Sequence, residues 1–117
     1  MNLFQLGDFV LASGAASRWI IDCRALTPSS WEALAFMLME ILPPFGSVEG
    51  VPRGGLPLAE ALRPYATTGP LLLADDVFTT GGSMERHRAG RDAIGAVVFA
   101  RNPTPAHVTA LFPMRAK

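Results

Sequence analysis

The sequence predicts an α/β protein built on a mostly parallel sheet, and three observations support this class. Residues 71–74 are apolar and run directly into two acids, which is typical of a strand buried on both faces. Two further strand-like segments, 47–51 and 94–100, stand before and after it. Stretches of helical character separate the three segments, and such alternation is typical of parallel strands joined by right-handed crossovers.

The composition indicates one folded domain without a strong overall charge. The chain has 117 residues, of which 50% are hydrophobic and 17% are charged, enough for one core and too few for two. Ten basic residues balance ten acidic ones, so we expect neither nucleic acid nor a membrane surface as a partner. Cys23 is the single cysteine, no apolar run reaches transmembrane length, and the first residues lack a basic signal region. We therefore expect a cytoplasmic protein.

The first part of the chain predicts an extended region and then one helix. Residues 4–14 are expected to form a short helix or turn followed by an extended segment, 15–17 a loop, and 19–24 a strand. A helix is expected from Pro28 to about residue 42, with Ser29 and Glu32 at capping-box spacing. It is apolar on nearly every side, so it is either deeply buried or shared with a second subunit. In so small a domain we favour the second alternative, a homodimer.

The later part of the chain predicts strands that alternate with short helices. The strand at 47–51 is followed by a helix over 56–62, and the strand at 71–77 by a polar helix over 84–89. A third strand is expected at 94–100 and a last one at 108–112. His87 and His107 have no second ligand at metal-binding spacing, so we expect them at the surface.

The most informative stretch is the end of the 71–77 strand and the turn after it. Asp75 and Asp76 fall at the strand's carboxyl end, where open α/β sheets bind ligands. The turn over 79–83 reads Thr-Thr-Gly-Gly-Ser, whose backbone amides and hydroxyls suit a phosphate. Two acids cannot bind a phosphate, so ribose hydroxyls or Mg²⁺ are their expected partners. Together these features indicate a phosphorylated sugar; the alternative is an ordinary strand-to-helix turn with a capping serine.

This stretch resembles the 5-phosphoribosyl-1-diphosphate (PRPP) motif of the type I phosphoribosyltransferases. The resemblance implies that Asp75 and Asp76 hold the ribose hydroxyls, with Mg²⁺ bound mainly through PRPP and the two acids nearby. It also implies that the residues after the acids bind PRPP, the turn itself around the 5-phosphate. These residues are Val77, Thr79, Thr80, Gly81, Gly82 and Ser83.

A second glycine-rich loop precedes the motif by one strand–helix unit. Residues 50–55 read Gly-Val-Pro-Arg-Gly-Gly and resemble the pyrophosphate loop of the same family. Arg53 offers a fork of donors to phosphate oxygens, and the backbone at Gly54 and Gly55 approaches the ligand closely. Such donors lower the barrier by meeting the charge that grows on the leaving pyrophosphate. The expected catalytic residues are therefore Asp75, Asp76 and Arg53.

The opening of the chain resembles the orotate phosphoribosyltransferases in particular. Their N-terminal pattern is matched by Phe9, Leu11, Ser13, Gly14, Ser17, Trp19, Asp22 and Arg24. The resemblance implies one domain over 1–117, with residues 1–27 forming a hood over an α/β core of residues 28–117. Trp19 would lie against the base, and the alternative is a core tryptophan. Arg101, which ends the third strand, would pair with the orotate carboxylate; the alternative is an exposed arginine.

One departure from that family bears on function. Its members carry a long region with a mobile catalytic loop between the helix at 56–62 and the next strand, and this chain has only residues 63–70 there. The resemblance implies transfer of phosphoribose from PRPP to a nitrogenous base, orotate in pyrimidine biosynthesis, with release of pyrophosphate. Because loop closure excludes water in such enzymes, the alternative is a non-catalytic regulatory module that binds PRPP or a nucleotide.

Overall fold

The structure, a computed structural model, describes residues 2–11 and 13–114. It contains a four-stranded parallel sheet in the order β3-β4-β5-β6 and a separate antiparallel pair, β1-β2. The predicted α/β class with a mostly parallel sheet is therefore confirmed. In chain order the elements are β1 (Phe4–Val10), β2 (Ala16–Ile21), η1 (Cys23–Ala25), α1 (Pro28–Met39), β3 (Ser47–Gly50), α2 (Leu56–Leu62), η2 (Arg63–Tyr65), β4 (Leu71–Phe78), α3 (Gly82–Arg88), β5 (Ala93–Ala100) and β6 (Val108–Pro113).

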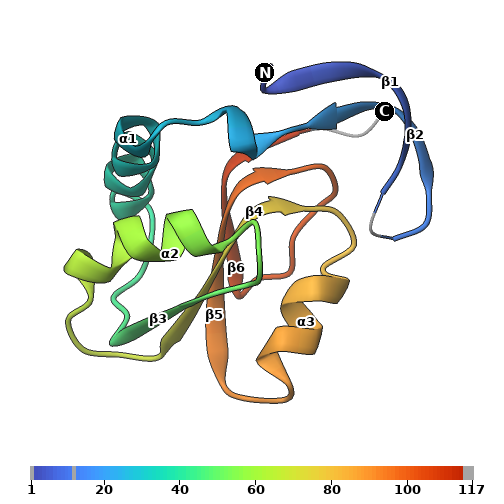
Figure 1. Ribbon diagram of the computed structural model, residues 1–117. Helices are drawn as coiled ribbons and strands as arrows, with labels where there is room; N and C mark the ends of the chain where they lie inside the picture. Colours follow the sequence, from blue (N-terminus) through green and yellow to red (C-terminus); the bar gives the residue numbers. More distant parts are fainter. Residues whose placement is uncertain (1, 12, 115–117) are drawn as a thin grey trace.

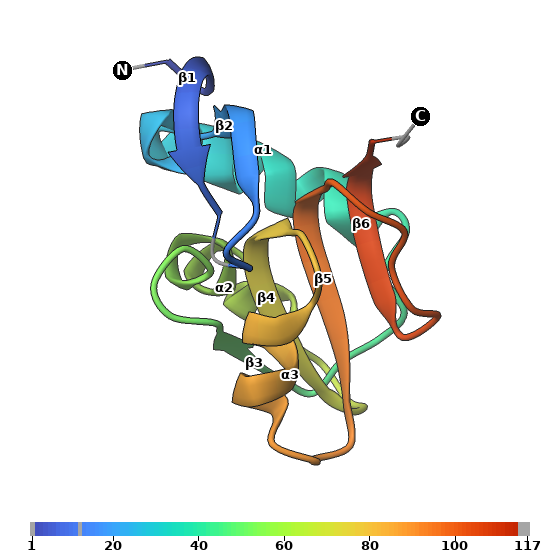
Figure 2. The ribbon, with the colours of Figure 1, turned by 90° about the vertical axis from the view of Figure 1, so that its right-hand side faces the viewer.

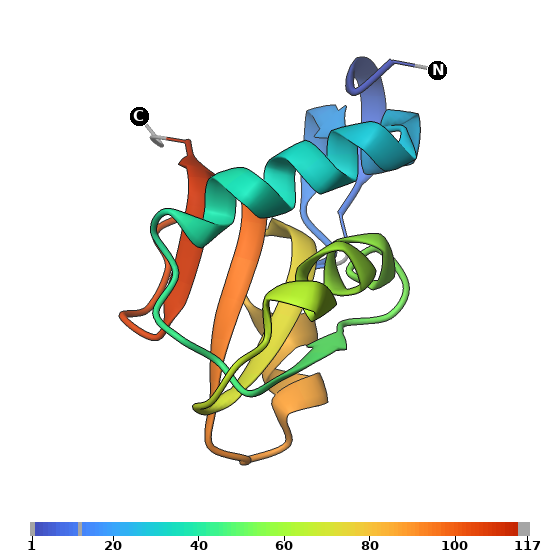
Figure 3. The ribbon, with the colours of Figure 1, turned by 90° about the vertical axis from the view of Figure 1, so that its left-hand side faces the viewer.

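The helices cover the two faces of the sheet unequally. α1 and α2 lie together on one face, and α3 lies on the other (Figures 1 and 3). The β1-β2 pair lies across the end of the sheet at which β4 ends (Figures 1 and 2). We call this pair, residues 4–21, the hood. It stands over the carboxyl ends of the strands, where parallel sheets bind ligands.

β4 is the central strand, and its side chains divide the core into two clusters. Leu72 and Ala74 pack with α1 and α2, whereas Leu73 packs on the other face with Met84 of α3. After the two acids, Val77 joins the first cluster and the next residue, Phe78, the second. The alternation of a strand, which has a period of two, is thus displaced by one residue at the acid pair.

The hood corrects the expectation for residues 4–14. We expected a short helix or turn followed by an extended segment, and the structure instead has strand β1 already from Phe4, paired with β2 in a register that opposes Leu6 and Trp19. β2 also begins at Ala16, inside the expected loop. Strand pairing depends on cross-strand neighbours more than on local preference, and the partner strand lies elsewhere in the sequence. The ring of Phe4 packs edge-on against Phe99, which ties the hood to β5.

The hood is joined to the core through Asp22. Its carboxylate accepts a hydrogen bond from the backbone N–H of Arg24, forms a two-pronged ion pair with the Arg24 guanidinium, and accepts from the Gln5 amide at 3.1 Å. The hydrogen bond from the Arg24 side chain is the main reason that the pKa of Asp22 falls to about 2. The junction between hood and α1 is therefore a hydrogen-bonded corner.

The start of α1 also differs from the expectation. The N-cap is Thr27, whose hydroxyl accepts from the Ser30 N–H at 3.2 Å, and the predicted cap, Ser29, lies inside the helix. Pro28 occupies the first turn, where a missing N–H costs nothing, and this moves the cap one residue before the proline. The buried face of α1 contains Trp31, Ala35 and Leu38.

The connection from η2 to β4 is short and fixed. Residues 66–70 join the two elements. The Thr67 N–H donates to the Phe45 carbonyl at 2.8 Å, and the Gly46 N–H donates to the Pro70 carbonyl at 2.9 Å. No long loop leaves the domain at this point. Elsewhere, β6 is reached from β5 through residues 101–107 without a helix. No helix in the described part of the chain is long and apolar enough to cross a membrane.

Candidate functional site

Three adjoining hollows lie below the hood at the carboxyl end of β4. The main one, which we call the cleft, has a volume of about 290 Å³. It is lined by Leu11, Ile20, Ile21, Pro52, Gly54, Asp75, Asp76, Val77, Thr79, Ser83 and Arg101. The phosphate pocket, about 60 Å³, lies against the 79–83 turn, and a side cavity of about 310 Å³ contains Arg53. The cleft thus joins the hood, both glycine-rich loops, the acid pair and the end of β5.

The two acids of β4 both face the cleft because the strand is irregular where they stand. Asp75 accepts a hydrogen bond from the Asp76 N–H at 2.8 Å, and Asp76 accepts one from the Val77 N–H at 2.7 Å. Each carboxylate therefore binds the amide that follows it. These local hydrogen bonds occur where the in-and-out alternation of β4 is displaced by one residue. As a result both side chains face the same hollow, whereas in a regular strand neighbouring side chains point to opposite faces.

The acids differ in exposure and in charge. Asp75 is buried, with 9% of its surface exposed, whereas Asp76 is partly exposed. Burial of Asp75, together with hydrogen bonding to Asp76 and the negative charge of Asp76, raises the pKa of Asp75 to about 8. Near neutral pH the pair therefore combines a proton donor and a carboxylate acceptor, a set that suits two neighbouring hydroxyl groups.

The raised pKa of Asp75 predicts a pH-dependent stability. The unfolded chain ionises this group near 3.8, whereas the folded chain keeps the proton to about 8. Between these values unfolding releases a proton, so the free energy of unfolding should fall as pH rises and level off above pH 8. We expect a loss of about 4 kcal/mol from this group between pH 5 and pH 8. Asp75→Asn should remove that slope.

Urea denaturation in metal-free buffer at several pH values measures this effect. Asp92 is exposed, so Asp92→Asn serves as the matched control and should keep the wild-type slope. Equal slopes for Asp75→Asn and wild type would show that Asp75 is already ionised in the folded protein.

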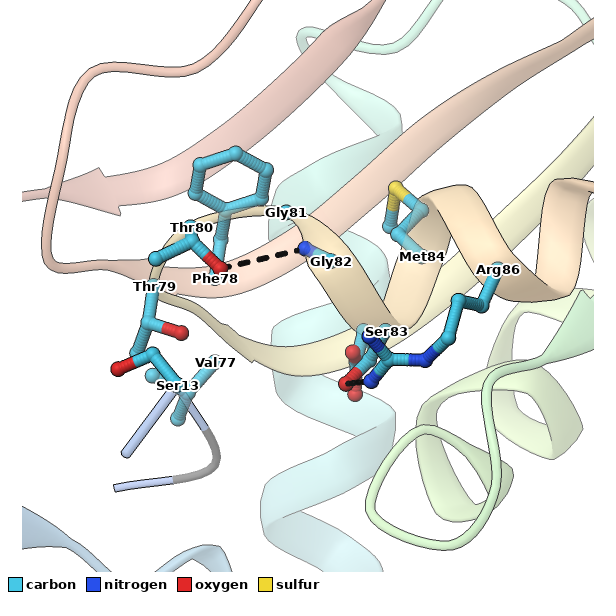
Figure 4. Close-up of a pocket in the computed structure, with 11 residues that line it drawn as sticks. Ser13, Val77, Phe78, Thr79, Thr80, Gly81, Gly82, Ser83, Met84 and Arg86 are labelled. Atoms are coloured by element: carbon cyan, nitrogen blue, oxygen red, sulfur yellow. Dashed lines mark hydrogen bonds between the residues drawn. The ribbon is translucent and has the colours of Figure 1, made fainter. Parts of the chain in front are cut away.

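The turn after β4 is held in a concave shape by glycine and by Asn102. Gly81 has φ +84°, a left-handed conformation that glycine adopts without strain. The Gly82 N–H points to the Thr80 hydroxyl at 3.4 Å, and the Asn102 amide donates to the Thr79 carbonyl at 2.7 Å. Figure 4 shows the turn curving around the phosphate pocket, with Ser13 of the hood end beside Thr79. The arrangement can enclose one small oxyanion.

The loop before α2 packs against β4 without space for side chains. A Cβ on Gly54 would overlap the Asp76 carboxylate, and one on Gly55 would overlap the Ala74 carbonyl. Close approach to backbone atoms therefore excludes a side chain at Gly55, whereas a side chain at Gly54 would displace the Asp76 carboxylate. The peptide bond between Pro52 and Arg53 is cis. The Arg53 side chain lies in the side cavity, which shares Ile21, Gly54 and Asp76 with the cleft.

The two residues expected at the base lie in contact with each other. The Arg101 guanidinium carbon stands 3.4 Å from the centre of the Trp19 ring, a cation–π contact. Its nitrogens donate to the Trp19 carbonyl at 3.3 Å and to the Ser17 hydroxyl at 3.0 Å. Burial lowers the pKa of Arg101. Arg101 lines the cleft, whereas Trp19 contacts Arg101 and is not among the lining residues.

The structure also identifies residues that the sequence did not. Ile20 and Ile21 supply an apolar wall to the cleft, Asn102 holds the turn, and Arg86 lines the phosphate pocket. Only Arg86 had a local signal, since it follows Ser83 by three residues on a helix and therefore lies on the same side. His87 and His107, which we expected at the surface, are partly buried, and each lies near a carboxylate. No group of three or more metal-ligating side chains occurs within the described residues.

These features together define the type I phosphoribosyltransferase fold. They are a parallel sheet, an acid pair before a Thr-Thr-Gly-Gly-Ser turn, a second glycine loop and an N-terminal hood. Solved structures agree. The orotate phosphoribosyltransferase of Aeropyrum pernix superposes with a TM-score of 0.76 at 25% identity, over 95% of this chain and 88% of that one. The UMP synthase of Leishmania donovani superposes with a TM-score of 0.77 at 20% identity, over 96% of this chain and 34% of that one. An orotate phosphoribosyltransferase of Mycobacterium tuberculosis, solved with inorganic phosphate, superposes with a TM-score of 0.66 at 18% identity, over 92% of this chain and 86% of that one.

Sequence comparison points to the same family. The orotate phosphoribosyltransferase of Methanopyrus kandleri is 32% identical over 110 residues, which cover 72% of this chain and 60% of that protein. The chain thus spans about three fifths of the length of this curated relative. No family model matches the sequence. The chain belongs to the type I phosphoribosyltransferase family, and the relatives named above include its orotate-specific members.

Proposed function

We propose that the protein transfers the 5-phosphoribosyl group of PRPP to orotate and releases pyrophosphate. The observation that carries this proposal is the cleft, which joins Asp75, Asp76, the Thr79–Ser83 turn, the 50–55 loop and Arg101 in one hollow. Ribose hydroxyls, a 5-phosphate and a carboxylate each find a chemically matched group along the cleft, and the group matched to pyrophosphate, Arg53, lies in the adjoining side cavity. The names of the related proteins support the same substrates.

The proposed roles follow the charge that moves during transfer. The attacking orotate nitrogen forms a bond to the anomeric carbon while the bond from that carbon to pyrophosphate breaks, and its electron pair leaves with the pyrophosphate. Asp75 and Asp76 hold the ribose hydroxyls, and the negative charge of the pair favours positive charge on the sugar. Arg53 lies in the side cavity, which adjoins the cleft at Gly54, and binds the departing pyrophosphate. The orotate nitrogen can enter already deprotonated, so no general base is required.

The residues present fit a magnesium ion that is held mostly by substrate. Mg²⁺ keeps several waters and binds through one or two carboxylates together with substrate phosphates, and Asp75 with Asp76 supplies two adjacent carboxyl groups at the cleft. We propose these two side chains as the protein's contribution to the ion's surroundings. When bound, Mg²⁺ neutralises part of the pyrophosphate charge.

For the base, we propose recognition by Arg101 and the ring beneath it. Trp19 holds the guanidinium of Arg101 in place, and together with Ser17 it fixes the side to which the remaining donors of Arg101 point. A planar carboxylate suits such a donor set. Trp19 would then act on orotate partly through Arg101.

A second candidate, a PRPP-binding regulatory module without turnover, is supported by the short connection over 66–70. That connection is hydrogen-bonded to Phe45 and Gly46, just before β3, so this chain has no loop of its own at that place to exclude water from the cleft. Turnover separates the two candidates.

The test is pyrophosphate release from PRPP and Mg²⁺ with a panel of bases headed by orotate. We expect release that depends on orotate, and we expect Arg101→Gln to raise KM for orotate about tenfold or more, because it removes a charged hydrogen bond to the carboxylate. PRPP binding without release for any base would favour the regulatory module. Binding of neither PRPP nor orotate would contradict both candidates.

We also infer a homodimer. α1 presents Phe36 and Met37 with 61% and 41% of their surfaces exposed, and Ile41, just after the helix, is 51% exposed. A helix that is apolar on both sides is typical of a face shared between subunits. Sedimentation equilibrium of wild type and of Phe36→Glu measures this assembly. The N-terminal segment over 1–27, which contains the hood, and the core over 28–117 are proposed to form one domain within each subunit.

A further inference from the structure

The arginines of this chain divide into two groups. The structure describes eight of them, and five form ion pairs with carboxylates: Arg18, Arg24, Arg63, Arg88 and Arg91. Arg53, Arg86 and Arg101 form no such pair with any described residue. These three line the side cavity, the phosphate pocket and the cleft, respectively. An unneutralised guanidinium in a hollow is a ready partner for a ligand anion.

Two of these three arginines have an anion in the proposed reaction, pyrophosphate for Arg53 and the orotate carboxylate for Arg101. Arg86 has none so far, although the substrate carries one more anionic group, the 5-phosphate. Its neighbours on α3 differ from it: Arg88 is held by Glu85, and His87 by Glu49. Arg86 is thus the cation of this short helix that stays available.

The position of the Arg86 guanidinium fits such a role. One terminal nitrogen donates to the Ser83 hydroxyl at 3.3 Å, and the other lies 3.2 Å from the place that a Cβ on Gly82 would take. The side chain therefore curls back over the turn, and Figure 4 shows it meeting Ser83 at the edge of the phosphate pocket. It is the single cation among the residues that line that pocket.

We propose that Arg86 binds the 5-phosphate of the substrate and selects for a phosphorylated pentose; this inference rests on the proposed function. The turn alone offers neutral amides and hydroxyls, whereas a phosphomonoester carries up to two negative charges. Arg86 supplies a forked charge partner, and its long contact with Ser83 is exchanged for phosphate oxygens. The pocket volume of about 60 Å³ holds a few water molecules, the size of one oxyanion and too small for a base.

The test compares ligand binding by four proteins: wild type, Arg86→Ala, Arg86→Lys and Arg88→Ala. Calorimetric titration with ribose 5-phosphate, and separately with inorganic phosphate, gives the affinities. We expect Arg86→Ala to weaken ribose 5-phosphate about tenfold or more, since a charged hydrogen bond is lost, and Arg86→Lys to recover part of it. Arg88→Ala removes the same charge from the same helix and should bind as wild type does.

The outcomes separate this inference from the function on which it rests. Ribose 5-phosphate binding that depends on Arg86, without pyrophosphate release from PRPP, keeps the role of Arg86 and overturns the enzyme. Equal binding by Arg86→Ala and wild type overturns the role of Arg86, whether or not release occurs. Equal losses for Arg86→Ala and Arg88→Ala overturn it too, because they indicate a general charge effect. Inorganic phosphate bound as tightly as ribose 5-phosphate overturns the selection for a pentose.

Discussion

Replacement of both Asp75 and Asp76 by asparagine should lower the affinity for PRPP by a factor of roughly 30 to 2,000. Each acid is proposed to bond a ribose hydroxyl; the bond to the charged Asp76 contributes about 1.5–3 kcal/mol, and the bond to Asp75, which keeps its proton to about pH 8, contributes about 0.5–1.5 kcal/mol. Together they amount to about 2–4.5 kcal/mol, and this free energy sets the expected change in the dissociation constant. Loss of the pair's negative charge also removes its attraction for Mg²⁺.

The double substitution is a sharp test because it should leave the fold intact. The asparagine oxygens can still accept the hydrogen bonds that Asp75 receives from the Asp76 N–H and Asp76 from the Val77 N–H. The change also removes the burial of an ionisable carboxyl group and its like-charge contact with Asp76, which together raise the pKa of Asp75. We therefore expect stability at pH 8 that is equal to or above that of wild type, together with lost binding.

Titration with PRPP and Mg²⁺, with thermal unfolding of the same samples, measures both quantities. The matched control is Asp8→Asn with Asp92→Asn, which removes two exposed carboxylates outside the cleft. Unchanged PRPP affinity in the Asp75 and Asp76 double variant would falsify both the enzyme and the regulatory module, since each requires a ribose held by these acids.

The parts of the fold and site that could be predicted are contiguous in the chain. The run over 71–76 and the turn over 79–83 carry their own signals, an apolar strand and a set of residues with one clear chemistry. The glycine loop at 50–55 could be interpreted as a pyrophosphate loop because it lies one strand–helix unit before the acid pair. Since parallel strands align their carboxyl ends, the meeting of these segments at one cleft could also be predicted.

The remaining features depend on partners that are distant in the sequence. β1 is a strand because it pairs with β2 and because Phe4 packs against Phe99. The sequence of residues 4–10 alone does not indicate this pairing. The Arg101–Trp19 contact joins residues 82 positions apart. Asp75 and Asp76 both face the cleft because local hydrogen bonds interrupt the two-residue alternation of β4. Arg86 went unnoticed because its spacing of three residues from Ser83 is common on helices and an exposed arginine there is ordinary; the ion pairs of the other described arginines make it distinct.

A second large effect is expected at Gly55, where stability rather than affinity should be lost. A Cβ at this position would overlap the Ala74 carbonyl oxygen and lie 2.8 Å from both the backbone nitrogen and the carbonyl oxygen of Val51. All three neighbours are backbone atoms, so no side-chain rotation can relieve the contact. Gly55 has φ −81°, an angle open to any residue, and close approach alone excludes a side chain.

Gly55→Ala should therefore force the 50–55 loop away from β4. That movement breaks the hydrogen bonds from the Gly55 N–H to the Val51 carbonyl and from the Val51 N–H to the Ala74 carbonyl, at 2.9 and 2.8 Å. Overpacking costs about 1–3 kcal/mol, and each bond adds about 1 kcal/mol. We expect a total loss of about 3–5 kcal/mol and, for a domain near 100 residues, a drop in Tm of roughly 10 °C or more.

Thermal unfolding of Gly55→Ala beside Gly90→Ala measures this loss. Gly90 has φ +78° and open space where its Cβ would stand, so its substitution carries only backbone strain of about 1 kcal/mol. A Gly55 variant as stable as the Gly90 variant would show that the loop can leave β4 cheaply. In that case the pyrophosphate end of the cleft would not be preformed, and Arg53 would have to be positioned by the substrate itself.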